Sequence, residues 1–528
     1  MTRLRLAATA ALLLAAPALA VPVTAQQITM GVGSPVTSLD PHFHNFGPNN
    51  AVASMLFGTL LEQDLDARLV PGLAESWRPS PDGDGWEFTL RPGVRFHDGA
   101  PLTSLDIAFT LARVPNVANS PGSFGVYSRQ VKTVEVIDDR RFRLRTGATS
   151  PVLPVDIAQV PILHHATHAD ATTERFNAGA LAVGTGPWRF VSWRSGDRLE
   201  VVRNDDYWGP RPHWQRATYR IMTNDATRVA ALLAGDVDFI SEVPTGDIAR
   251  LRRDPRFVLS EKGSLRHVYI AFDHMRDGPT PFATDNDGKP LPRNPMRDVR
   301  VRRALSLAMD RRAITERVME GVAIPTNQFM PPGAYGYDPG IEVPAADAAA
   351  ARRLLAEAGY PDGFRLTLHG SNDRYVNDAR IVQAVAQMWT RAGVRTSVDV
   401  APYSAFISKA SRQEFTAFFV SWGSASGEPS AGLRATMGSF DPPRGLGAVN
   451  RSRYSNPEFD RMMLAAMQIL DPAERERALQ AATRLAIAED AAILPIHFQV
   501  NVWAMRRGLR HVGRADERSR PQDVGPAE

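Results

Sequence analysis

The sequence of 528 residues contains no cysteine. The chain can therefore form no disulfide, bind no metal through thiolates and use no cysteine as a nucleophile. A bacterial lipid anchor also requires an acylated cysteine. We therefore expect a protein that is not tethered to a membrane by lipid.

The sequence also lacks a strong excess of charge. Its 61 lysine and arginine residues are nearly balanced by 57 aspartate and glutamate residues, and the two signs are interspersed along the chain. The absence of a basic block argues against nucleic acid as a partner. A hydrophobic fraction of 44% and a charged fraction of 22% are typical of a folded globular protein, and the length predicts two or three domains.

Long hydrophobic runs are absent except at the N-terminus. Arg3 and Arg5 precede an apolar stretch at 6–19, and small residues suited to cleavage follow at 18–20 and 23–25. The apolar stretch is short for a membrane span, which needs about 20 apolar residues. The pattern predicts a signal peptide over 1–25 and a mature protein in the periplasm.

Common catalytic motifs are missing as well. We find no Gly-x-Ser-x-Gly elbow, no His-Glu-x-x-His pair, no Gly-x-x-x-x-Gly-Lys loop and no Gly-x-Gly-x-x-Gly loop. Adjacent acids such as Asp205 and Asp206 are common in loops and do not by themselves indicate catalysis. We therefore expect no catalytic residues, no cofactor and no enzymatic activity, and we disfavour a hydrolase.

Short strands and helices alternate along the chain. Helices are predicted over 226–234, ended by Gly235, and over 378–392, ended by Gly393, while 299–319 carries one apolar helical face. This alternation predicts an α/β protein. Extended segments expected to form strands include 28–32, 86–91, 131–137, 141–145, 236–240, 394–400 and 492–505.

A series of short segments is more specific. Residues 73–77 (LAESW) and 88–99 (FTLRPGVRFHDG) are followed by 184–188 (GTGPW), 203–208 (RNDDYW) and 232–238 (LLAGDVD). In this order they resemble the family-5 extracytoplasmic solute-binding proteins, the peptide/nickel-binding family of ABC importers. Further segments that resemble the family lie at 298–305, 354–363 and 454–458.

The resemblance implies a two-lobed periplasmic binding protein of type II, with hinged lobes and an extra subdomain on the first lobe. After the signal peptide at 1–25, lobe I is expected to comprise 26–70, 181–275 and 490–528. The extra subdomain is expected at 71–180 and lobe II at 276–489. Hinge strands are expected near 269–273 and 493–498. A ligand that contacts both lobes shifts such a protein toward its closed state.

The resemblance also implies a function. We expect a monomeric substrate-binding component that captures a small peptide-like or related solute and delivers it to the permease subunits of an ABC importer at the inner membrane. Two alternatives remain open. The ligand could instead be an opine, a sugar derivative or a metal chelate, or the protein could carry a ligand to a sensor.

The first candidate binding segment is 420–429, directly after a predicted strand. It contains Trp422, Ser424 and Glu428. Trp422 resembles the cleft-lining tryptophan of the family, although the core of lobe II is an alternative place for it. Ala425 stands where peptide-binding relatives carry an aspartate that pairs with the ligand's ammonium group. A ligand without a free amine, or one held by Glu428, is therefore expected.

The second candidate segment, 370–378, contains Asn372, Arg374 and Tyr375. Arg374 lies near the position at which peptide-binding relatives carry an arginine for the ligand's carboxylate. A guanidinium fork suits a carboxylate. The alternative is a surface ion pair with Asp373 or Asp378.

The third candidate segment, 37–46, places Phe43 and His44 beside the expected cleft. His42 and His44 lack a third ligand at metal-binding spacing, so we predict no metal there. The other histidine cluster, His164, His165 and His168, is interpreted as surface histidines of the extra subdomain.

Overall fold

The computed structural model describes residues 27–148, 150–424 and 426–527. The expected signal peptide at 1–25 and the position of Ala425 lie outside these residues. Within the described part, no helix combines the length and the apolar character needed to cross a membrane.

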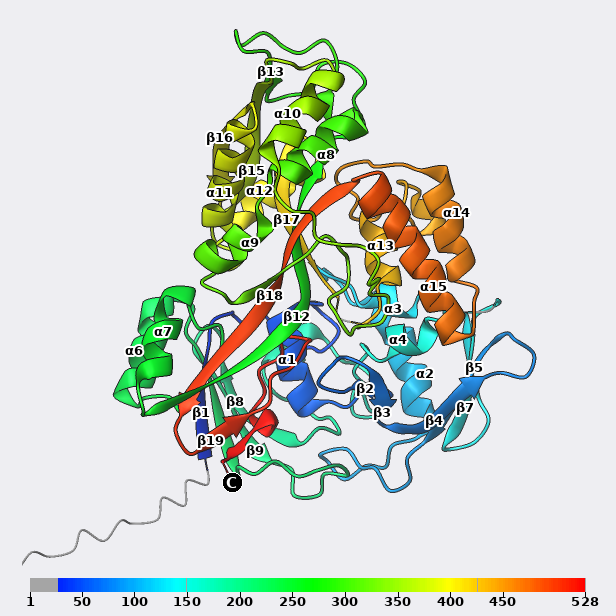
Figure 1. Cartoon of the computed structure of the whole chain (residues 1–528). Coiled ribbons are helices and arrows are strands. Elements are labelled where there is room, and N and C mark those ends of the chain that lie inside the picture. The colour runs from blue at the N-terminus through cyan, green and yellow to red at the C-terminus, as the bar shows by residue number, and fades with distance from the viewer. Residues whose placement is uncertain (1–26, 149, 425, 528) are drawn as a thin grey trace, which may run out of the picture.

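Two lobes share one large curved sheet (Figure 1). Strands β12 (Phe257–Phe272) and β18 (Ile493–Arg506) are long and antiparallel, and they run from one lobe into the other. Their pairing extends from Phe257 opposite Arg506 to Ala271 opposite Ile493, with register shifts between Gly263 and His267 and between Val268 and Tyr269. These strands connect the two lobes and pass beside the region between them.

Lobe I is built around β1 (Gln27–Val32), which is parallel to both β10 (Arg216–Ile221) and β11 (Phe239–Ile240). The predicted strand at 236–240 is shorter than expected, because only its last two residues pair. Helix α6 (Asp225–Ala234) begins at the Asn224 cap and ends at Gly235, whose φ of 86° suits glycine. The sheet continues through β9 (Arg198–Arg203) to β8 (Trp188–Arg194), and α1 (Gly47–Leu56) and α7 (Thr245–Arg253) complete the lobe.

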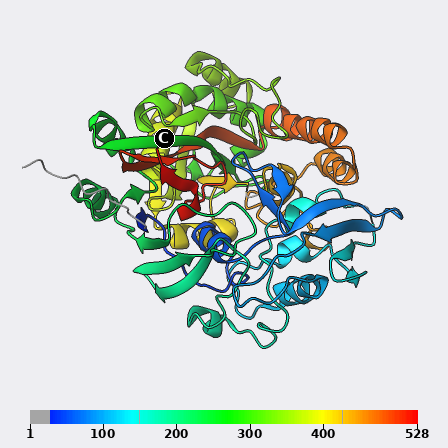
Figure 2. The ribbon, with the colours of Figure 1, turned by 90° about the horizontal axis from the view of Figure 1, so that it is seen from below.

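A separate four-stranded sheet lies beside lobe I and contains β4 (Ala74–Pro79), β5 (Gly85–Leu90), β7 (Arg141–Arg145) and β6 (Thr133–Val136) in that order. The predicted hairpin at 131–145 is confirmed. Helix α2 (Ser104–Arg113) begins with a capping box and packs on this sheet's core. Seen from below, this blue and cyan sheet and the C-terminal segment (red) lie in different parts of the molecule (Figure 2).

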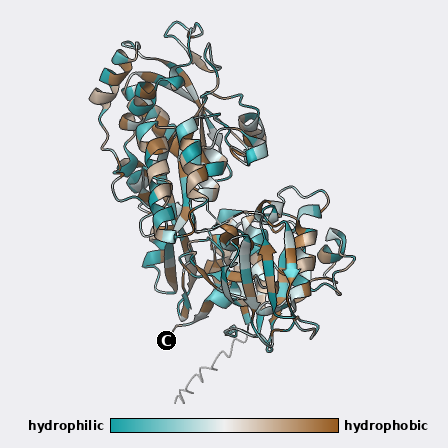
Figure 3. Cartoon of the chain, turned by 90° about the vertical axis from the view of Figure 1, so that its right-hand side faces the viewer, coloured by the Kyte–Doolittle hydropathy of each residue, from teal (hydrophilic) through white to brown (hydrophobic). Residues whose placement is uncertain are grey.

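Lobe II contains the parallel strands β15 (Phe364–Ser371), β16 (Val394–Ala401) and β17 (Ala417–Gly423). Helix α11 (Asp378–Arg391) covers them with an apolar face, and α12 (Tyr403–Ser411) follows β16. Helices α13 (Ser430–Thr436), α14 (Pro457–Ala466) and α15 (Pro472–Thr483) form a second group (Figure 1). Figure 3 shows the two lobes in profile, with apolar residues (brown) on the packed elements.

The expected helix over 299–319 is interrupted. Helix α8 (Val299–Ala308) ends before Met309, whose backbone is extended. Asp310 then caps a new helical segment, α9 (Arg311–Ala313), by accepting a hydrogen bond from the backbone N–H of Ala313. A capping side chain in the middle of the apolar pattern therefore divides it into two.

Candidate functional site

Arg266 of β12 forms the centre of a polar cluster between the lobes. Its Nη2 lies 2.9 Å from Glu517 Oε2, and its Nη1 donates to the Ser421 hydroxyl of β17 at 3.1 Å. Ser264 donates to the other oxygen of Glu517 at 2.6 Å. Burial alone would raise the pKa of Glu517, but Arg266 and Ser264 together hold it below its ordinary value.

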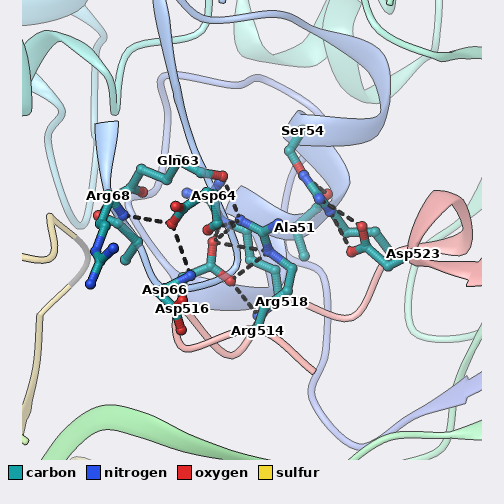
Figure 4. Close-up of polar contacts among 12 residues, drawn as sticks. Ala51, Ser54, Gln63, Asp64, Asp66, Arg68, Arg514, Asp516, Arg518 and Asp523 are labelled. Carbon is teal, nitrogen blue, oxygen red and sulfur yellow. Dashed lines mark hydrogen bonds and ion pairs between the residues drawn. The ribbon is translucent and has the colours of Figure 1, made fainter. Parts of the chain in front are cut away.

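The residues just before Glu517 contact the segment that contains Gln63 and Asp64 (Figure 4). Arg514 donates to the backbone oxygens of Gln63 and Asp64 and pairs with Asp516 at 2.7 Å. The side chains of Arg514 and Asp516 are only 4% and 2% exposed. Glu517 has a φ of 66°, which is unusual for a residue other than glycine. These contacts hold the strained residue against Arg266.

Arg374 of lobe II faces the same cluster. Its guanidinium lies over the rings of Tyr375, at 5.4 Å, and Tyr403, at 5.7 Å. Among the described residues, no carboxylate lies within 4.0 Å of it, so the alternative ion pairs with Asp373 and Asp378 do not form. Asp378 instead accepts hydrogen bonds from Ser371 and from backbone N–H groups.

Both lobes contribute to the cluster. Glu242 of lobe I, with a φ of 53°, accepts a hydrogen bond from Ser34 at 3.1 Å. Glu242 is exposed at the surface, yet desolvation by the surrounding protein raises the pKa of its carboxyl, while Arg228, Ser34 and Arg374 oppose the shift. Arg374 also lowers the pKa of Glu517. The cationic side chain therefore faces two carboxylates from other parts of the chain.

Tyr375 lines the cluster beside Arg374. Its ring makes edge contacts with Tyr403 and Phe419, at centroid distances of 6.0 and 5.8 Å. Burial, followed by the neighbouring Tyr403, raises the pKa of Tyr375 to about 12. Its hydroxyl therefore stays protonated at neutral pH and can donate a hydrogen bond.

Trp422 and Ser421 lie on opposite faces of β17. Because neighbouring residues of a strand alternate, Ser421 shares the face of Arg266, whereas Trp422 shares that of His267, its partner across the ladder. Trp422 packs against the core formed with Phe329 and Leu433, and its Nε1 is buried without a hydrogen-bond partner among the described residues. A ligand contact by Trp422 stays a prediction.

Ser424 and Glu428 are buried in the loop after β17. The Ser424 hydroxyl donates to the backbone oxygen of Glu428 at 3.1 Å. The Glu428 carboxylate lies 3.5 Å from Arg475 of α15, and burial raises its pKa although Arg475 opposes the shift. Glu428 therefore already has a cationic partner, which leaves it poorly suited to hold a ligand amine.

The remaining predicted residues are Asn372, Phe43 and His44. Asn372 is exposed. The backbone oxygen of Phe43 accepts from Ser120, and His44 contacts Thr37 and stacks on Phe46. Roles for these three residues in ligand binding stay predictions. Nearby His42 is buried and its ring nitrogens contact Pro161 and Arg113, so it is structural.

The sequence reasoning did not single out Arg266, Glu517, Glu242 or Tyr403. Arg266 stands in an extended segment without regular alternation, and Glu517 stands in a C-terminal segment crowded with other charges. No local pattern distinguishes these residues, because long-range pairing brings them together. Ser421 lies in the candidate segment 420–429 but is not among its predicted ligand contacts.

Comparison with known proteins agrees with this architecture. The model of the bacterial extracellular solute-binding proteins, family 5, matches residues 68–442. Heme-binding protein A of Haemophilus influenzae is 29% identical, covering 85% of this chain and 83% of the relative. Glutathione-binding protein GsiB of Salmonella typhimurium is also 29% identical, covering 93% of this chain and 92% of the relative.

Solved structures show the same fold. HbpA2 from Haemophilus parasuis has a TM-score of 0.79 at 23% identity, covering 95% of this chain and 100% of that one. The oligopeptide-binding protein AppA from Bacillus subtilis, in complex with a nonapeptide, has a TM-score of 0.75 at 22% identity, covering 95% and 99%. The fold is that of type II periplasmic binding proteins, and the family match spans most of the chain. The chain belongs to the family-5 bacterial extracellular solute-binding proteins.

Proposed function

We propose that this protein is the periplasmic substrate-binding subunit of an ABC importer and that it captures a small peptide-like solute carrying a carboxylate. The proposal rests on Arg374. Its guanidinium lies over two tyrosine rings and has no ion-pair partner within 4.0 Å among the described residues. A guanidinium fork with free donors matches a carboxylate in two parallel hydrogen bonds.

The surrounding groups favour a ligand that also carries a positive charge. Glu242 lies in the same cluster and, among the described side chains, has no cationic group within 4.0 Å, whereas Glu428 is paired with Arg475. A ligand amine would therefore face Glu242 of lobe I while the carboxylate faces Arg374 of lobe II. In this arrangement, Glu242 serves in place of the family aspartate whose position is occupied by Ala425.

The placement of these groups supports capture by closure. Arg374 and Glu242 belong to different lobes, so a ligand that contacts both stabilises the closed state by the difference between its affinities for the two states. With lobe I at 26–70, 181–275 and 490–528 and lobe II at 276–489, as proposed from the sequence, Glu242 and Glu517 belong to lobe I and Arg374 belongs to lobe II. We propose a binding role rather than an enzymatic one, in a monomer that delivers its ligand to permease subunits.

A thermal-shift screen of residues 27–528 tests the proposal. The panel comprises glutathione, di- to tetrapeptides, agropinic acid, sugars, haem and nickel–histidine complexes. A ligand at 100 times its Kd stabilises the folded state by about 2.7 kcal/mol. Stabilisation by carboxylate-bearing peptides is the expected result. Stabilisation only by haem, sugars or nickel complexes would overturn the proposal of a peptide-like ligand. The absence of a thermal shift with every compound of the panel would also overturn it.

A further inference from the structure

Three side chains of the four-stranded subdomain meet at the start of α2, away from the Arg266 cluster. Asp106 stands in the first turn of α2, and His164 and His165 lie where the turn at 165–170 begins. One potential ligand atom from each lies within 4.8 Å of the others. The side chain of Asp106 is fully buried, whereas that of His165 is 39% exposed.

The Asp106 carboxylate fixes the ring of His165. Its Oδ1 lies 2.7 Å from His165 Nδ1 and accepts from the backbone N–H of His165 at 2.8 Å. Its Oδ2 accepts from the backbone N–H of Thr103 at 2.7 Å. A buried carboxylate held in this way keeps the proton on Nδ1, so the lone pair of His165 resides on Nε2.

His164 contacts Thr167 through its Nδ1. The Thr167 hydroxyl donates to Asp98 at 2.8 Å and lies 2.7 Å from His164 Nδ1. The backbone N–H of Thr167 donates to the same Nδ1 at 3.3 Å. Neither His164 Nε2 nor His165 Nε2 has a hydrogen-bond partner among the residues that the structure describes. His165 therefore offers its Nε2 lone pair to a ligand, and the ring of His164 lies beside it at a centroid distance of 5.0 Å.

We propose that this Asp106–His164–His165 cluster binds one divalent transition-metal ion of the zinc, nickel or copper class. Imidazole nitrogens suit these ions, and a carboxylate hydrogen-bonded to a metal-bound histidine is the usual second layer of such sites. The exposed side of His165 gives the ion access from solvent, and water completes its coordination. The ion links the start of α2 to residues 164–165.

Burial corrects the interpretation of two of the three histidines, His164 and His168, as surface residues. His164 is 9% exposed and His168 is fully buried. Both ring nitrogens of His168 contact backbone oxygens, of His164 at 3.0 Å and Leu181 at 3.1 Å, so His168 is not available as a ligand. The exposed edge of the cluster belongs to His165, whose side chain is 39% exposed.

Isothermal titration calorimetry with Zn²⁺ tests the proposal, using a protein of residues 27–528 from which a chelator has removed bound metal. The visible spectrum of the same protein loaded with Co²⁺ reports the geometry of the ligands. We expect one ion per chain. His165→Ala should weaken binding at least tenfold and remove the Co²⁺ spectrum, whereas His213→Ala, which removes an exposed histidine of lobe I, should leave both unchanged.

Three results would overturn the site: no Zn²⁺ binding, unchanged binding in His165→Ala, or an equal loss in His213→Ala. His164→Gln, which keeps a polar side chain of similar size, provides a second variant whose loss of binding is expected. Because the cluster is separate from the lobe interface, Arg374→Gln should bind Zn²⁺ as the wild type does. A failure of this site would therefore leave the proposed solute capture untouched.

Discussion

Glu517 accepts hydrogen bonds from the guanidinium of Arg266, a residue 251 positions earlier in the chain. This ion pair connects the C-terminal segment to β12 where that strand passes between the lobes. Arg266 also contacts Ser421, so the same guanidinium connects the C-terminal segment to β17 of lobe II. The C-terminal segment is therefore part of the wall around the proposed ligand site.

Replacing Glu517 by glutamine should reduce stability. The side chains of Glu517 and Arg266 are 28% and 20% exposed, so the change leaves a largely buried guanidinium without its charged partner. We expect the free energy of unfolding in urea to fall by about 1–3 kcal/mol. Glu458→Gln is the matched control, because its pair with Arg461 is 53% and 69% exposed and should contribute less than about 1 kcal/mol. Equal effects of the two changes would contradict this account.

Gly427→Ala should weaken ligand binding by obstructing closure. Gly427 has a φ of 71°, and a Cβ at this position would lie 2.3 Å from the backbone oxygen of Ala67 in lobe I. We expect Kd to rise about tenfold, which corresponds to about 1.4 kcal/mol against the closed state.

The control for this change is Gly333→Ala. Gly333 has a φ of 82° but no atom within 4 Å of the added Cβ. Alanine at this position therefore strains the backbone without colliding with the other lobe. Its ligand affinity should match that of the wild type in titration calorimetry. If both variants lost affinity to the same extent, backbone strain and not lobe contact would be the cause.

Asp156 should make stability depend on pH. Burial, with a contribution from Glu428, raises its pKa to about 7, against the opposing charges of Arg434 and Arg129. The folded protein therefore retains this proton up to about pH 7, whereas the unfolded chain loses it near pH 4. The contribution of Asp156 to the free energy of unfolding is fully present below pH 4, falls as the pH rises to 7, and is constant above that.

Asp156→Asn should remove this dependence. Urea titrations at pH 4.5, 6 and 8 should show that the variant gains stability relative to the wild type as the pH rises, by a total of about 1–4 kcal/mol. An asparagine can still accept the hydrogen bond that Gln130 donates to Asp156. Parallel pH profiles for the two proteins would show that Asp156 has an ordinary pKa.

Local signals predicted much of the fold. Asn224 and Gly235 bracket α6, and the turn before Arg141 produces the hairpin of β6 and β7, because capping and turn chemistry act within a few residues. The last strand was predicted at 492–505, and β18 covers Ile493–Arg506. The helix over 299–319 was wrong in extent, because the Asp310 cap outweighed the apolar periodicity.

The site was less accessible to sequence reasoning. Arg374 and Tyr375 were singled out and lie together, but their partners Arg266 and Glu517 come from other regions through pairing of β12, β17 and the C-terminal segment. A hydrogen-bond partner that lies far away along the chain leaves no local pattern in the sequence. The ion pair of Glu428 with Arg475 was likewise not predictable, since it depends on how α15 packs against the loop after β17.

We propose that Arg374 receives a ligand carboxylate between the lobes. Titration calorimetry with the peptide that gives the largest thermal shift, and with the same peptide amidated at its carboxylates, tests it most directly. In the wild type, amidation should weaken binding at least tenfold, about 1.4 kcal/mol. In Arg374→Gln, both forms should bind with similarly low affinity. Equal affinities of the two peptides for the wild type, or full affinity in Arg374→Gln, would contradict the account.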